Sequence, residues 1–492
     1  MTLGDRIRSG AKWLAVGNIG TQIIQFCVGI VLARLLAPED FGMLATTQAF
    51  TGLAGFVSGG GMGQALVRAK KVTDKDFHVV FTLQLIICCV LYIVFYIIAP
   101  YFAQWFGDPL YQDLLRVTAT YFLLRPFGNM YNSWQHREMR FKQRSIITIV
   151  VTIFGSVLSA SIAWAGMGVW SLVVGGLGST ILNIILLRAI TPYRPQLCFD
   201  LSSVKQHSSY GAKIAVNDII VYLRDQTPNV IISRLAGAHV VGLYNKADSL
   251  MRMPAKLISG STYQTVFRAM AQEQDNLDRC RYLYYRSLLL VATYTFPFYF
   301  GLWWAAEPFI TFIYGPKWSP AAQPLSIMWI AGMLLAISMQ SGAVAAAKNR
   351  VGSEMWIQLQ ILAVMIIGAY LGISFGLVGV AWGVIVAAVF EVIRLTHLAL
   401  SAIEGSWTGV LRALLPALKV NAPLVIALAT VDIVLPESLQ TQYPGLHLAA
   451  LLLTGASAYA ITFLIRPPPE LKSESKRWRL ALVAAGRLGK PS

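Results

Sequence analysis

The sequence predicts an all-α polytopic membrane protein with about fourteen transmembrane helices. Of its 492 residues, 56% are hydrophobic and 13% are charged, whereas soluble domains carry about 25% charged residues. A helix needs about 20 apolar residues to cross a bilayer, and it leaves no backbone group unpaired in lipid. Windows that meet this length begin near residues 13, 42, 79, 113, 146, 169, 210, 241, 287, 324, 356, 377, 416 and 447.

The first of these windows follows directly on a short polar and basic segment. It continues as far as Leu36. A signal-peptide core is much shorter, so we expect this window to remain as the first membrane helix. The seventh and eighth windows differ from the rest because they contain several charged residues.

Lysine and arginine are concentrated in every second loop between the windows. Basic residues mark cytoplasmic loops, so this alternation predicts that both chain termini lie in the cytoplasm. The alternate loops contain Lys317 and the acidic residues Glu39, Asp40, Asp108, Glu307 and Glu437. The basic set is Arg6, Arg8, Lys12, Arg68, Lys70, Lys71, Lys75, Arg137, Arg140, Lys142, Arg144, Arg194, Lys205, Arg268, Arg279, Arg281, Arg286, Lys348, Arg350, Arg412, Lys472, Lys476, Arg477, Arg479 and Lys490.

Short similar segments occur in the same order in two halves of the chain. The pairs are Ser9–Lys12 with Tyr210–Lys213, Ala33–Leu36 with Ser233–Ala236, Gly42 with Gly242, Trp105–Gly107 with Ile313–Gly315, and Gly166–Val169 with Gly376–Gly379. They predict two six-helix bundles that enter the membrane from the same side, as parallel repeats around an axis along the membrane normal. In transporters of this plan the substrate cavity lies between the repeats.

The predicted organisation therefore has four parts: an N-terminal six-helix bundle (1–205), a C-terminal six-helix bundle (206–410), two additional transmembrane helices (411–466) and a basic cytoplasmic tail (467–492). We expect the tail to be disordered or to lie on anionic lipid.

Ionisable residues inside the predicted spans are candidate site residues, because each costs about 2.5–3.5 kcal/mol to insert and usually faces the bundle interior. The basic ones are Arg116, Arg125, Arg224, Lys246, Arg252 and Lys256, and the acidic ones are Asp218, Asp225 and Asp248. A surplus of positive charge suits an anionic substrate such as a phosphate. The three acids are candidates for coupling to protons or sodium.

A structural alternative remains open for the same residues. Asp248, Arg252 and Lys256 are spaced to form one stripe on a helix, and Asp248–Arg252 and Arg224–Asp225 can be simple ion pairs. The aromatic residues near the span ends, Tyr222 among them, are interpreted as an interfacial belt rather than as sugar contacts.

The sequence indicates no metal, cofactor or nucleic-acid site. Its five cysteines and six histidines show no metal-ligand spacing, and it has no nucleotide-binding loop. The basic residues are scattered between apolar segments, which argues against nucleic-acid binding. An acidic pair in the first outward loop, Glu39 and Asp40, is typical of membrane glycosyltransferases. We favour a tight turn and helix start there.

Three segments resemble the polysaccharide-transporter (Wzx-type) branch of the multidrug/oligosaccharidyl-lipid/polysaccharide flippase superfamily, abbreviated MOP. The second of them is the most specific, and the resemblance extends from residue 1 to about residue 465. The segments are Ser9-Gly10-Ala11-Lys12-Trp13, Leu32-Ala33-Arg34-Leu35-Leu36-Ala37-Pro38-Glu39-Asp40-Phe41-Gly42 and Tyr314-Gly315-Pro316-Lys317-Trp318.

The resemblance implies two six-helix bundles that form a V-shaped cavity, with two helices added at the end. It implies a flippase in the bacterial inner membrane, not an enzyme. Such a protein moves undecaprenyl-pyrophosphate-linked oligosaccharide to the periplasmic leaflet for exopolysaccharide, capsule or O-antigen (lipopolysaccharide) synthesis. Membrane lipids, a polysaccharide polymerase and a chain-length regulator are the expected partners.

Two other functions are considered. A cation-coupled multidrug exporter of the same superfamily predicts acidic residues in the first-half helices, where this chain has Asn18, Gln22, Gln25 and Gln48. A membrane polymerase or ligase of lipid-linked sugars predicts a large outward catalytic loop, whereas the longest outward loop here spans only about residues 306–323.

Overall fold

The computed structural model of the protein describes residues 3–59, 74–138, 140–199 and 208–488. Throughout these ranges the regular structure is helical, with no strand, which confirms the predicted all-α class. The chain divides into two compact units, Met1–Asn245 and Lys246–Ser492. The side chains of both predicted entry motifs, Ser9–Lys12 and Tyr210–Lys213, lie outside the described part of the chain.

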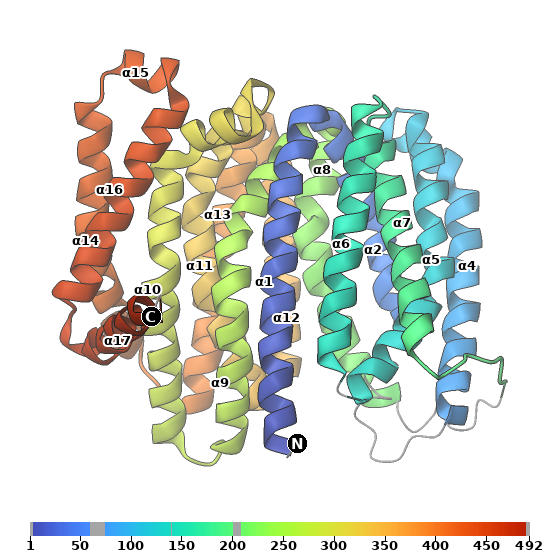
Figure 1. Ribbon diagram of the computed structural model, residues 1–492, viewed down its shortest axis with the longest axis horizontal. Helices are drawn as coiled ribbons and strands as arrows, with labels where there is room; N and C mark the ends of the chain where they lie inside the picture. Colours follow the sequence, from blue (N-terminus) through green and yellow to red (C-terminus); the bar gives the residue numbers. More distant parts are fainter. Residues whose placement is uncertain (1–2, 60–73, 139, 200–207, 489–492) are drawn as a thin grey trace. The chain divides into compact units, whose positions relative to one another are not determined.

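The first unit is built from long helices that lie alongside one another (Figure 1). A buried aromatic and aliphatic core that includes Phe102, Tyr111 and Leu114 packs α4 against α5. The helices are α1 (Leu3–Leu35), α2 (Pro38–Gly59), α4 (Asp74–Phe106), α5 (Leu110–Arg137), α6 (Phe141–Trp164), α7 (Trp170–Ile190) and the first part of α8 (Ser208–Pro254).

The second unit contains the remainder of α8 and the later helices. They are α9 (Gly260–Gln272), α10 (Leu277–Phe309), α11 (Ala322–Ala347), α12 (Val351–Gly372), α13 (Gly376–Ile403), α14 (Trp407–Val434), α15 (Glu437–Gln442), α16 (Pro444–Ile465) and α17 (Lys472–Leu488). Short π- and 3₁₀-helical turns join several of them, including Ala255–Ser259, Ile310–Tyr314 and Pro316–Ala321.

The helical backbone is interrupted after α1 and again within α8. The first follows α1, where the Asp40 carboxylate accepts a 2.9 Å hydrogen bond from the Ala37 amide and Pro38 begins α2. This geometry confirms the predicted turn. The second lies inside α8, where Gly237 has φ 84° and ψ 172°. Because a residue with a side chain rarely adopts that φ, Gly237 divides α8 into two helices.

Two glycines allow α2 and α8 to cross with their backbones in contact. A Cβ added to Gly42 would collide with the carbonyl oxygen of Ala238, and one added to Gly242 would collide with the carbonyl oxygen of Pro38. Beside the crossing, the Thr46 hydroxyl donates a 2.9 Å hydrogen bond to the Ser233 hydroxyl. Small residues permit this close approach, as they commonly do between membrane helices.

Among the described residues, eight helical segments are long and apolar enough to cross a membrane. They are Lys75–Phe106, Phe141–Trp164, Trp170–Ile190, Leu277–Tyr314, Pro316–Ala347, Val351–Ile403, Trp407–Val434 and Pro444–Ile465. One of these, Val351–Ile403, contains both α12 and α13. Helices α2, α5 and α8 are long but more polar, and so they fall outside this set, whereas Gly20–Leu35 of α1 counts as a shorter apolar helix.

The C-terminal tail is not disordered where the structure describes it. Residues Lys472–Leu488 form α17, which lies across the ends of α14 and α16 rather than along them (Figure 1). Leu471, immediately before it, is completely buried. Of the two alternatives expected for the tail, disorder is therefore wrong for these residues, and a position on anionic lipid stays a prediction.

Candidate functional site

A cavity of about 510 Å³ lies inside the first unit. Its size falls within the range of about 300–1,000 Å³ that is usual for ligand sites. Helices α2, α5, α7 and α8 supply its walls. The lining residues are Leu44, Ala45, Gln48, Thr51, Gly52, Thr118, Tyr121, Phe122, Arg125, Leu172, Val173, Tyr222, Gln226, Asn229 and Asn245.

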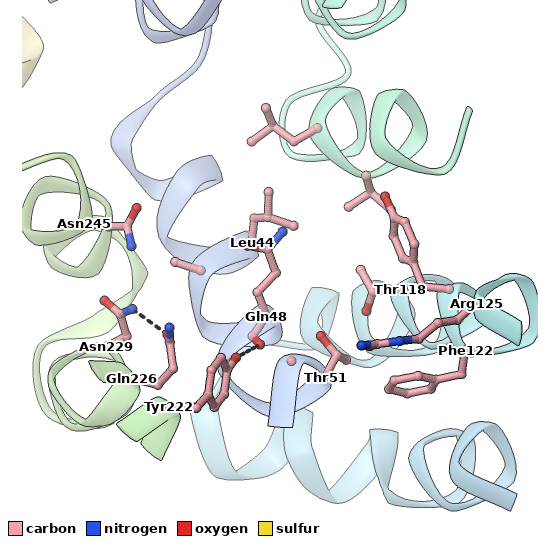
Figure 2. Close-up of a pocket in the computed structure, with 15 residues that line it drawn as sticks. Leu44, Gln48, Thr51, Thr118, Phe122, Arg125, Tyr222, Gln226, Asn229 and Asn245 are labelled. Carbon is pink, nitrogen blue, oxygen red and sulfur yellow. Dashed lines mark hydrogen bonds between the residues drawn. The ribbon is translucent and has the colours of Figure 1, made fainter. Parts of the chain in front are cut away.

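Helical spacing explains how the polar residues converge on this cavity. On α5, Thr118, Tyr121 and Arg125 are three and four residues apart, which places them on one face of the helix. On α8, Tyr222 and Gln226 follow the same rule. Figure 2 shows the α5 residues on one side of the cavity, the α8 residues on the other, and Gln48 and Thr51 between them.

Hydrogen bonds hold part of the wall in place. The Tyr222 hydroxyl donates a 2.7 Å bond to the Gln48 carbonyl oxygen, and the Asn229 amide donates a 2.9 Å bond to the Gln226 side-chain oxygen (Figure 2). The side-chain oxygen of Asn229 is buried and has no partner in the described structure.

Arg125 is the charged residue among the lining residues that the structure describes. Its guanidinium lies against Gly55 of α2, where an added Cβ would collide with Nη1. Gly52 similarly makes room for the Tyr222 hydroxyl. Within the described ranges Arg125 has no carboxylate partner. Its donors therefore remain available for an anionic oxygen.

The other basic residue predicted on α5, Arg116, faces away from the cavity. Nine residues separate it from Arg125, which corresponds to roughly half a turn of rotation around the helix. The Arg116 guanidinium lies 4.4 Å from the ring centroid of Tyr96 on α4. This is a cation–π contact, which stabilises the packing of the two helices.

Two of the predicted basic residues form ion pairs. Arg224 is buried and its Nη2 lies 3.0 Å from Asp225 Oδ1. The Nε of Arg252 lies 2.9 Å from both carboxylate oxygens of Asp248, one helical turn earlier. Arg224–Asp225 and Asp248–Arg252 are therefore ion pairs, as the structural alternative predicts. The surplus of positive charge is thus smaller than the count of six basic and three acidic residues indicates.

The last two basic residues also lie outside the cavity wall. The Lys246 ammonium lies 4.7 Å from the ring centroid of Tyr314 and 5.0 Å from that of Trp318. Lys256 is exposed and sits in the π-helical turn that follows Pro254. The α-helical register ends at this turn. Lys256 therefore does not continue the stripe on one helix face that was predicted for Asp248, Arg252 and Lys256.

Asp218 differs from the two paired carboxylates. It is exposed and lies one turn before Tyr222 on the same face of α8, although it does not line the cavity.

The described residues contain no group of three or more potential metal ligands.

The Asp248–Arg252 pair provides a testable prediction. Replacing either partner alone, as in Asp248→Asn or Arg252→Gln, should lower the free energy of unfolding by roughly 2 kcal/mol, because the remaining charge loses its partner in a half-buried position. The double variant should lose less than the sum of the two single losses. Thermal unfolding of the detergent-solubilised protein measures all three. Additive losses would contradict a direct pair.

Sequence reasoning missed most of the neutral cavity residues. A search for ionisable residues does not find these side chains, because they carry no charge. They are Thr51, Thr118, Tyr121, Gln226 and Asn229. Their signal is spacing, since amides and hydroxyls recur at three- and four-residue intervals within otherwise apolar helices. Tyr222 was assigned to the interfacial belt, whereas the structure places it in the cavity wall.

Long helices with a cavity between them, partly lined by polar side chains, are typical of a membrane transporter. The fold is similar to that of the lipid II flippase MurJ in its inward closed conformation, with a TM-score of 0.71 and 15% identity over 92% of this chain and 98% of MurJ.

The chain belongs to the family described as "Polysaccharide biosynthesis protein", whose model matches residues 31–323. The lipopolysaccharide biosynthesis protein WzxC of Escherichia coli strain K12 is 25% identical over 358 residues, which cover 71% of this chain and 72% of WzxC. The teichuronic acid biosynthesis protein TuaB of Bacillus subtilis strain 168 is 24% identical over 491 residues, which cover 97% and 99% of the two chains.

Proposed function

We propose that this protein is a flippase that moves undecaprenyl-pyrophosphate-linked oligosaccharide from the cytoplasmic to the periplasmic leaflet. The product would serve exopolysaccharide, capsule or O-antigen synthesis. The family and the names of WzxC and TuaB support a role in polysaccharide assembly.

The observation that carries the proposal is the chemistry of the cavity wall. Hydroxyl and amide side chains can both donate hydrogen bonds to sugar hydroxyls and accept them. The guanidinium of Arg125 can bind a phosphate oxygen through two parallel hydrogen bonds. A hydrophilic headgroup can therefore leave water at a lower desolvation cost, while the lipid tail stays in the bilayer.

The cavity also bears on the choice between functions. An exporter of cationic drugs needs acidic groups along its path, and the described cavity lining contains none. A polymerase needs a catalytic loop, and the turns at Gly107 and Gly315 that join consecutive long helices are short. Transport of an anionic, sugar-bearing lipid fits these features better than either alternative.

We also propose fourteen membrane helices, arranged as two six-helix repeats with two added helices. The local backbone supports this organisation. Gly107 and Gly315 both have positive φ, as do Gly166 and Gly376, and each pair occupies matching places in the two halves. The break at Gly237 divides α8 at the point that corresponds to the turn between α1 and α2.

For the location we propose the bacterial inner membrane, with both chain termini in the cytoplasm. The basic residues at the end of α5 and the start of α6, and those in the first turns of α10, support this orientation. They include Arg137, Arg140, Lys142, Arg144, Arg279, Arg281 and Arg286. A polymerase and a chain-length regulator are the proposed protein partners.

Among the three candidate acids we propose Asp218 as the ion-coupling residue, because Asp225 and Asp248 are held by neighbouring arginines. An Asp218→Asn variant should change the dependence of transport on the proton or sodium gradient. Unchanged ion dependence in this variant would contradict the assignment.

The sidedness of the lipid-linked oligosaccharide tests the proposed function directly. In cells that lack the protein, radiolabelled repeat units should accumulate where a glycosidase confined to the periplasm cannot reach them. Complementation with the intact gene should expose them. Accumulation of unpolymerised units on the periplasmic side would instead indicate a polymerase.

A further inference from the structure

Helix α17 is fixed to the second unit by several contacts along one side. Trp478 Nε1 donates a 2.8 Å hydrogen bond to the Tyr294 hydroxyl of α10, and the Ser475 hydroxyl donates a 3.1 Å bond to the Leu464 carbonyl oxygen of α16. Arg286 of α10 pairs with Glu474 at 2.9 Å and also donates a 2.9 Å bond to the Glu470 carbonyl oxygen. The helix is therefore docked rather than loose.

The remaining surface of α17 combines apolar and basic side chains. Leu480, Leu482 and Val483 are between 54% and 61% exposed. The neighbouring basic residues Lys472, Lys476 and Arg477 are also exposed. Exposed apolar residues beside lysines and arginines are typical of a helix that lies in the plane of a membrane interface.

The position of α17 agrees with that interpretation. A short connection, residues 466–471, joins it to the end of α16, and it lies across that helix (Figure 1), so it runs beside the membrane boundary rather than through the bilayer. Its partner Arg286 belongs to the basic start of α10. In the proposed orientation this is the cytoplasmic end, where the leaflet carries anionic lipid.

We propose that α17 binds the anionic phospholipid headgroups of the cytoplasmic leaflet. The basic side chains of Lys472, Lys476 and Arg477 contact the charged headgroups. The apolar side chains of Leu480 and Val483 enter the part of the acyl chains that lies next to the headgroups. Charge complementarity selects this occupant, because basic residues next to exposed leucines suit an anionic lipid surface better than a neutral one. The inference rests on the proposed orientation but not on the transported substrate.

Fluorescence quenching in nanodiscs tests the proposal with the full-length protein. A fluorescent amino acid replaces Leu480, and the bilayer contains either brominated phosphatidylglycerol or brominated phosphatidylcholine at the same mole fraction. Quenching by the anionic lipid should exceed quenching by the neutral lipid about twofold or more, because each basic residue near the surface favours anionic lipid. The difference should shrink at high salt, which screens the charges.

Two triple variants provide the comparison. The first variant should abolish the preference for the anionic lipid, because it removes the three basic side chains of the proposed site. It combines Lys472→Gln, Lys476→Gln and Arg477→Gln. The second variant removes the same charge from other exposed positions of this unit and should retain the preference for the anionic lipid. It combines Arg268→Gln, Arg279→Gln and Arg412→Gln. The thermal unfolding temperature of both variants verifies that they are folded.

Each other outcome overturns the proposal. Absence of quenching by either lipid would place α17 away from the membrane, as expected for a protein-docking surface. Equal quenching by both lipids would remove the anionic selectivity. Because nanodiscs contain no oligosaccharide substrate, these results are independent of whether the protein is a flippase.

Discussion

An Arg125→Gln variant should flip lipid-linked oligosaccharide about tenfold to a hundredfold more slowly than the native protein. Hydrogen bonds to a charged group contribute about 1.5–3 kcal/mol, and a phosphate that enters the cavity would lose them. The rate can be measured as the appearance of labelled oligosaccharide outside proteoliposomes, where an added glycosidase reaches it.

The matched control for this variant is Arg116→Gln. It removes the same charge from the same helix, but from the face that packs on Tyr96 rather than from the cavity wall. We expect at most a small change in rate and a modest loss of stability. Arg125→Lys, which keeps the charge without the planar fork, should be intermediate. Normal flipping by Arg125→Gln, with loss in Arg116→Gln, would exclude this cavity as the path.

Alanine at Gly42 or Gly242 should destabilise the protein strongly. The new Cβ would overlap a carbonyl oxygen of the opposing backbone, at Ala238 or Pro38 respectively, and a backbone cannot rotate aside as a flexible side chain can. Overpacking of this kind costs about 1–3 kcal/mol. The measurement is thermal unfolding in detergent, together with the yield of inserted protein.

Gly29→Ala is the control, because a Cβ there meets no atom within 4 Å. It should be neutral or slightly stabilising, since alanine favours helix. The double variant Gly42→Ala with Gly242→Ala should cost less than the sum of its parts, because both residues strain one crossing. Strict additivity, or a stable Gly42→Ala protein, would show that α2 and α8 are not in close contact.

Much of the fold could be predicted from hydropathy. Windows expected near residues 79, 113, 146 and 169 correspond to α4, α5, α6 and α7. Helices that contact lipid must be apolar along most of their length, so composition reveals them. The hydropathy signal is weaker for α2, α5 and α8, and these are the helices that direct polar residues into the cavity.

The site was only partly predictable, because charge alone does not determine which partner a residue meets. Six basic residues qualified as candidates, and Arg125 is the member of that set that lines the cavity. Arg224 and Arg252 meet carboxylates, and Lys246 meets aromatic rings. Periodicity can show that Arg116 and Arg125 face opposite ways, but only packing determines which of the two faces inward.

The amide and hydroxyl side chains of the cavity lining have a broader consequence for specificity. Side-chain amides present a donor and an acceptor at similar positions, and hydroxyls rotate to offer either. A wall made mainly of such groups recognises that a ligand is polyhydroxylated without requiring one stereochemistry at each carbon. We therefore expect this transporter to tolerate changes in the sugars of the repeat unit, as long as the phosphate that we propose as the ligand of Arg125 is kept.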